Sequence, residues 1–189
     1  MSSLLYTTKI AATEYHPVPD ALDYHDVLTI LHDHSTLAHL FWPRLVTTIT
    51  KEPQPGMTEW RVSSSDSRNK ATMTSTATGV ACEEEMPLGL WMTVKYSIVE
   101  SGAETKNDDA DSHHLLPGLY LEVGRSVSVP RPLSPLTSIK DDPITKTQNL
   151  LSFLDDLGRN GKDLEAASAG LQGSATDPDP DATDKSKTD

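Results

Sequence analysis

Hydrophobic positions recur with two different periods along this chain, and the first region combines a strand with helices. Residues 4–14 are rich in Thr, Ile and Tyr and predict a first strand. Apolar residues at helical spacing follow, with Asp20 as a candidate N-cap for a helix over 20–34. Ser35 is the candidate cap of a shorter helix, which Pro43 ends. Two helices are therefore expected directly after the first strand.

After these helices the period of the apolar positions changes to two, which is typical of strands. Turn residues such as Pro and Gly separate the successive apolar runs. In the clearest run, 90–99, every second residue is apolar, as expected for an antiparallel sheet with one buried face. The predicted strands are 45–51, 58–65, 71–78, 80–85, 90–99 and 119–129.

A final helix is predicted after these strands from its boundary residues and its apolar face. Asp142 is placed as N-cap, Pro143 at the first helical position, and Gly158 after the last turn. One broad face is apolar, which predicts burial against the sheet. That face consists of Ile144, Thr147, Leu150, Leu151, Leu154 and Leu157.

These elements predict one α+β domain over residues 1–160 and an acidic tail over 161–189. Residues 101–114 are polar and acidic, which predicts a mobile loop between two strands. The tail begins with a weakly helical stretch. After Leu171 it has no large apolar residue, so the composition predicts disorder there.

Charge and cysteine content exclude several classes of protein. A net charge of −12, without clustered Lys and Arg, argues against binding to nucleic acid. Cys82 is the only cysteine, so no intramolecular disulfide is possible. No secretory leader and no integral membrane segment is apparent. We therefore expect a cytoplasmic protein, with nuclear access possible, whose oligomeric state stays open.

Clustered histidines are the main candidate for metal chemistry. The residues concerned are His25, His32, His34 and His39. His25 and His32 return to one helix face, but seven residues separate their Cα atoms by ~10 Å along the axis, which disfavours a shared ion. A solvated helix face is the preferred interpretation. The sequence thus predicts no metal, no organic cofactor and no assignable catalytic residue. Cys82 is interpreted as a buried apolar thiol and the run Glu83–Glu85 as a solvated strand end.

The order of elements resembles the helix-grip fold of the START-like (SRPBCC) superfamily, which includes Bet v 1-type allergens, lipid-transfer domains and aromatase/cyclases. The resemblance implies a curved antiparallel sheet of six to seven strands wrapped around the long C-terminal helix. Three short segments, 27–34, 60–62 and 76–80, also resemble a group of small fungal proteins of that superfamily. That group has no assigned chemistry and transfers no catalytic residue.

The resemblance favours an apolar cavity between the sheet and the last helix over a filled core. Our first hypothesis is a protein that binds or carries a small hydrophobic molecule. A second is a cyclase- or isomerase-type enzyme, in which a His or a Tyr such as Tyr96 or Tyr120 moves a proton. A third is a non-catalytic interaction module. The candidate cavity-lining residues are Trp60, Met73, Met92, Val94, Tyr96, Leu121, Val123, Leu151 and Leu154.

Overall fold

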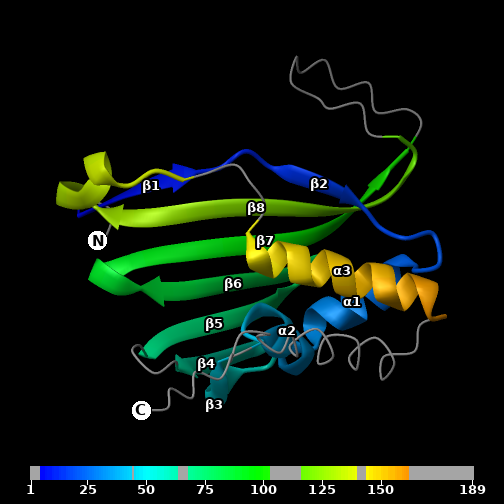
Figure 1. Ribbon diagram of the computed structural model, residues 1–189, viewed down its shortest axis with the longest axis horizontal. Coiled ribbons are helices and arrows are strands. Elements are labelled where there is room, and N and C mark those ends of the chain that lie inside the picture. Colours follow the sequence, from blue (N-terminus) through cyan, green and yellow to red (C-terminus); the bar gives the residue numbers. More distant parts are fainter. Residues whose placement is uncertain (1–4, 44, 64–67, 103–115, 140–143, 162–189) are drawn as a thin grey trace, which may run out of the picture.

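The computed structural model shown in Figure 1 describes residues 5–43, 45–63, 68–102, 116–139 and 144–161. One antiparallel sheet of eight strands curves around a C-terminal helix, with two short helices on the same side. The predicted helix-grip α+β class is thereby confirmed. The predicted tail beyond residue 161 and most of the predicted loop 101–114 lie outside the described residues. No helix in the described ranges is long and apolar enough to cross a membrane.

Every pair of neighbouring strands in the sheet is antiparallel, in the order β1-β8-β7-β6-β5-β4-β3, and β2 also pairs with β8. The strands are β1 (Tyr6–Ile10), β2 (Glu14–Pro17), β3 (Val46–Gln54), β4 (Met57–Ser63), β5 (Arg68–Thr76), β6 (Gly79–Met86), β7 (Leu90–Ser101) and β8 (Gly118–Pro130). Two short 3₁₀ turns, η1 (Pro87–Gly89) and η2 (Arg131–Leu136), precede β7 and follow β8.

The sheet has eight strands rather than six or seven because the predicted first strand is divided. Its two parts, β1 and β2, pair with different stretches of β8. Between them Ala11 is buried, and its N–H donates to the carbonyl of Arg125 at 3.0 Å. The second part also continues to Pro17, beyond the predicted end at residue 14. Through this division, β2 brings Glu14 to Arg125 of β8.

The first helix, α1 (Tyr24–His32), begins later than predicted. Its N-cap is Asp23, whose carboxylate accepts from the N–H of Asp26, while the Asp26 carboxylate accepts from the N–H of Asp23, both at 2.9 Å. This reciprocal capping box satisfies two backbone donors that would otherwise lack partners. Asp20, the predicted cap, lies instead within a turn in which the N–H of Leu22 bonds to the carbonyl of Pro19.

The second helix, α2 (His34–Phe41), is capped by Asp33 rather than by Ser35. The Asp33 carboxylate accepts hydrogen bonds from the backbone N–H groups of Ser35 and Thr36, both at 3.1 Å. One aspartate thus ends α1 and starts α2, and the two helices follow each other without a linker.

The last helix, α3 (Thr145–Arg159), carries the predicted apolar face. Its N-cap is Ile144, and the predicted Asp142 and Pro143 lie outside the described residues. Gly158 lies inside the helix rather than after it. A Cβ at this glycine would come within 2.7 Å of Pro19, so close packing explains the glycine better than a helix stop. The buried residues of α3 are Thr147, Leu150, Phe153, Leu154 and Leu157.

Candidate functional site on the concave face of the sheet

The nine residues predicted to line a cavity all lie in or against one apolar cluster between the sheet and the helices. All are buried except Met92 and Leu151, which are half-buried and pack against the cluster. Within the described residues, the Nε1 of buried Trp60 has no hydrogen-bond partner. The structure therefore places these residues together, and their role as the lining of a ligand cavity stays a prediction.

The concave face of the sheet has two ends that differ in burial. In Figure 1, α3 begins near the middle of the sheet and crosses only the half that contains the end of β7 and the start of β8. We call this half the covered end; its buried concave-face residues are Val80, Tyr96, Ile98, Leu121 and Val123. We call the apolar positions beyond the first turn of α3 the open end; all are half-buried, and they are Met86, Leu90, Met92 and Val127.

Cross-strand register shows that the open end is one continuous surface. Met92 pairs with Val127 on β8, and Met86 pairs with Leu90 across the turn between β6 and β7. Side chains at such positions contact one another on the same face of a sheet. Val129, in the row beyond them, is buried beside η2. The open end is therefore an apolar surface bounded by η2 on one side and by the start of α3 on the other.

A buried ion pair stands at the boundary between the two ends. Lys146, in the first turn of α3, pairs with Glu84 of β6, which lies next to Met92 in the sheet register. Their side chains are only 13% and 12% exposed. The Lys146 ammonium also lies 5.0 Å from the ring centroid of Trp42. Burial lowers the pKa of Lys146 to about 8, while a carboxylate in contact favours the charged form.

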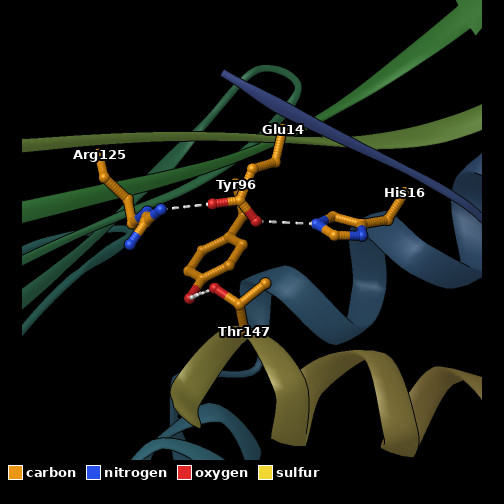
Figure 2. Close-up of polar contacts among 5 residues, drawn as sticks. All are labelled: Glu14, His16, Tyr96, Arg125 and Thr147. Atoms are coloured by element: carbon orange, nitrogen blue, oxygen red, sulfur yellow. Dashed lines mark hydrogen bonds and ion pairs between the residues drawn. The ribbon is translucent and has the colours of Figure 1, made fainter. Parts of the chain in front are cut away.

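A second charged cluster connects β2 to β8 on the same concave face. Arg125, 4% exposed, donates to Glu14 at 2.6 Å, and the other carboxylate oxygen of Glu14 lies 3.1 Å from Nε2 of His16. Figure 2 shows Glu14 between the arginine and the histidine. The carboxylate thus compensates a guanidinium that would be costly to bury alone. His16 is the more accessible end of the cluster, at 22% exposure.

Tyr96 adds a neutral polar contact beneath α3. Its hydroxyl lies 3.2 Å from Oγ1 of Thr147, toward which it points in Figure 2, and its ring stacks on Phe41 of α2 at 5.4 Å. Burial raises the pKa of the Tyr96 hydroxyl, so it stays protonated at neutral pH. Tyr120 does not share this site, because it alternates with buried Leu121 and therefore lies on the opposite face of β8.

Of the clustered histidines, His34 connects elements of the fold. His34 is buried, with Nδ1 at 2.9 Å from Thr58 Oγ1 and Nε2 at 3.1 Å from Ser75 Oγ, so it joins α2 to two strands. Burial lowers the pKa of His34, and the neighbouring His32 lowers it further. His25, His32 and His39 are exposed. In the part of the chain that the structure describes, no three metal-binding side chains gather.

Burial disfavours the reactive form of the lone cysteine. Cys82 is buried on the concave face, and burial raises the pKa of its thiol to about 11. Since the thiolate is the nucleophile, little of the reactive form exists at neutral pH. This agrees with the structural role predicted from its flanking residues.

Glu14, Glu84, Arg125 and Lys146 were not among the predicted site residues. Only for Arg125 does the sequence contain a usable signal, because it occupies a position of β8 between Val123 and Val127 where alternation demands an apolar residue. Glu14, Glu84 and Lys146 offer no such signal, because the partner of each lies far away in the sequence. Glu84 lies within a run of three glutamates that look alike until the sheet register is known.

A charged groove of about 420 Å³ lies on the convex face, near the bulged strand β3. Glu59 and Arg61 of this groove alternate along β4 with buried Trp60 and Val62, and Glu59 pairs with Lys70 there at 3.2 Å. It differs in chemistry from the predicted apolar cavity and shares only Trp60 with it. The groove is lined by Thr50, Glu59, Trp60, Arg61, Asn69, Lys70 and Glu85.

Comparisons with known proteins give low similarities. No protein-family model and no curated protein matches the chain. Among solved structures, Ara h 8.0201 is 13% identical (TM-score 0.38; 89% of this chain and 99% of that chain covered). The hypothetical protein jhp0584 of Helicobacter pylori is 11% identical, with a TM-score of 0.39 and coverage of 90% of this chain and 88% of that chain. The Zhui aromatase/cyclase of Streptomyces sp. R1128 is 13% identical, with a TM-score of 0.34 and coverage of 88% of this chain and 94% of that chain. TM-scores this low support no transfer of ligand or reaction.

Proposed function

We propose that this chain binds a small hydrophobic molecule on the concave face of its sheet, at the open end and against the start of α3. The observation that carries the proposal is the continuous half-buried surface of Met86, Leu90, Met92 and Val127 beside the buried Lys146–Glu84 pair. Small-molecule sites are mostly apolar with a few polar groups that orient the ligand, and this surface has that composition.

Assignment to the START-like superfamily, and to the fungal group within it, is part of the same proposal. What supports it is the element order, with α1 and α2 between the first strands and the remainder of the sheet and α3 against the concave face. A cytoplasmic location is likewise proposed, on the basis of composition alone.

Binding is testable with Nile red, a hydrophobic dye whose fluorescence rises in apolar surroundings. The wild-type protein should bind the dye saturably, and fatty acids, sterols or polyketide-type aromatic compounds should displace it. Met92→Lys should weaken dye binding about tenfold or more, because it places a charge in the apolar surface.

Thr93→Lys is the matched control, since Thr93 is the half-buried neighbour on the opposite face of β7. It should leave dye binding unchanged. Thermal melts establish that both variants are folded. Absence of saturable dye binding by the wild type, or equal loss in the two variants, would contradict the proposal.

The Glu14–His16–Arg125 cluster favours a second candidate function, an acid–base enzyme of the cyclase or isomerase type. His16 is the partly accessible group that would move a proton, and the carboxylate of Glu14 holds its ring. Tyr96 has no exposed surface and its hydroxyl is engaged by Thr147, so it would not take part in the proton transfer.

Exchange of α-hydrogens for deuterium in β-tetralone, a hydrophobic ketone, tests this candidate. NMR would follow the exchange rate with the wild type, with His16→Gln and with the exposed-histidine control His25→Gln. An enzyme predicts acceleration that His16→Gln alone removes. Exchange no faster than in buffer would leave binding as the function.

A further inference from the structure

Lys146 differs from an ordinary surface lysine because its ammonium group is removed from water. Its ammonium is buried against Glu84 and the Trp42 ring, at the edge of the open end. Burying an ion pair costs desolvation free energy that attraction between the charges often only balances, and apolar replacements are frequently as stable. Stability alone is therefore a weak explanation for this pair.

Resting on the proposed function, we propose that Lys146 forms a reversible imine with the carbonyl group of a hydrophobic aldehyde or ketone. The apolar part of that ligand lies on Met92, Leu90 and Val127, and its carbonyl carbon faces the lysine amine. The ligand class is thereby narrowed from hydrophobic molecules in general to those with a reactive carbonyl.

Glu84 supplies the proton acceptor that the reaction needs. Proton transfer within the ion pair gives a neutral amine and a neutral carboxyl group, and burial makes this transfer less costly than it is in water. The amine nitrogen bonds to the carbonyl carbon as the C=O π bond breaks, and one proton moves from nitrogen to the resulting oxygen to give a carbinolamine. Glu84 then returns its proton to the hydroxyl oxygen, which leaves as water as the C=N bond forms. The product is a protonated imine beside the Glu84 carboxylate, so atoms and charge balance.

The lowered basicity of Lys146 supports this chemistry. Its pKa of about 8 makes the neutral, nucleophilic amine more abundant at neutral pH than in an exposed lysine, whose pKa is ~10.4. A desolvated lysine amine is a common nucleophile toward carbonyl substrates. An arginine at this position would hold Glu84 equally well but form no imine.

Reductive trapping with decanal and sodium cyanoborohydride tests the proposal. The hydride converts an imine into a stable decyl amine, which intact mass and peptide mapping assign to individual lysines. Lys146 should be labelled about tenfold faster or more than the exposed Lys95 near neutral pH. The small polar glycolaldehyde should show no such preference, since it lacks an apolar chain.

Two lysine variants and an alcohol that cannot form an imine serve as controls. Lys146→Arg should lose the fast labelling, whereas Lys95→Arg should keep it. Decanol, which cannot form an imine, should displace Nile red from the wild type and from Lys146→Arg alike. If decanol displaces the dye while Lys146 reacts no faster than Lys95, the imine is wrong and hydrophobic binding stands. If decanol displaces nothing, the proposed function itself fails.

Discussion

The covered end and the open end of the concave face are built on the same strands, yet they hold their side chains differently. At the covered end, Tyr96 is stacked on Phe41 and bonded to Thr147, with no exposed surface left. At the open end, Met92 occupies an equivalent position of β7 but is only half-buried. The difference arises from where α3 begins, since both residues alternate correctly into the concave face.

Burial of residues on one face of a sheet therefore depends on the layer that packs above them. A strand pattern places apolar residues on a common face, but only a packed helix removes that face from water. Where α3 starts, the apolar surface is left half open and two charged groups, Lys146 and Glu84, are held beside it. This boundary is where a ligand would add the missing layer.

Truncation of one leucine at each end should change the free energy of unfolding by very different amounts, and this is the largest effect that we expect. Leu154→Ala removes a side chain on the buried face of α3 that is 1% exposed, and it should lower the free energy of unfolding by ~2–5 kcal/mol. Leu90→Ala, at the half-buried open end, should cost less than about 1 kcal/mol. Urea unfolding of both variants measures the difference. Equal costs would mean that α3 does not distinguish the two ends.

A smaller effect is expected from the polar contact at the covered end. Tyr96→Phe removes one hydroxyl and leaves the buried Thr147 hydroxyl without its tyrosine partner, which should cost about 1–2 kcal/mol. Tyr120→Phe, on the convex face of the next strand, is the control and should change stability by less than ~0.5 kcal/mol. Thermal or urea unfolding distinguishes the two. If Tyr96→Phe leaves the free energy of unfolding unchanged, the contact with Thr147 contributes nothing to stability.

The smallest expected effect is a pH dependence that comes from His34 at the covered end. Because burial lowers the pKa of His34 in the folded state, the unfolded chain takes up this proton at a higher pH. The free energy of unfolding should therefore decrease as the pH falls below ~6.5, until the folded-state pKa is reached. Above that window His34 should contribute no slope.

Urea unfolding between pH 7.5 and 5 (about the window of an ordinary histidine) would measure this slope, with His34→Gln expected to reduce it. The exposed His25→Gln should leave the slope unchanged. If both variants retain the full slope, other groups are responsible for the pH dependence.

Local rules in the sequence predicted most of the elements. Alternation in 90–99 predicted β7, and the spacing of Leu150, Leu154 and Leu157 predicted the buried face of α3. Such patterns succeed because a strand or helix must present one apolar face to the core. The helix caps were less well predicted, since Asp20, Asp23 and Asp33 are all able to cap and only backbone geometry selects among them.

The fold class, the strand faces and the apolar residues that meet in the core follow from patterns along the chain. Which charged residues lie inside depends on how the strands and helices pack together. Arg125 meets Glu14, and Lys146 meets Glu84, across separations that no local pattern encodes. The physical reason is that periodicity depends on neighbours along one element, whereas an ion pair between β2 and β8, or between β6 and α3, depends on strand register and on where the helix begins.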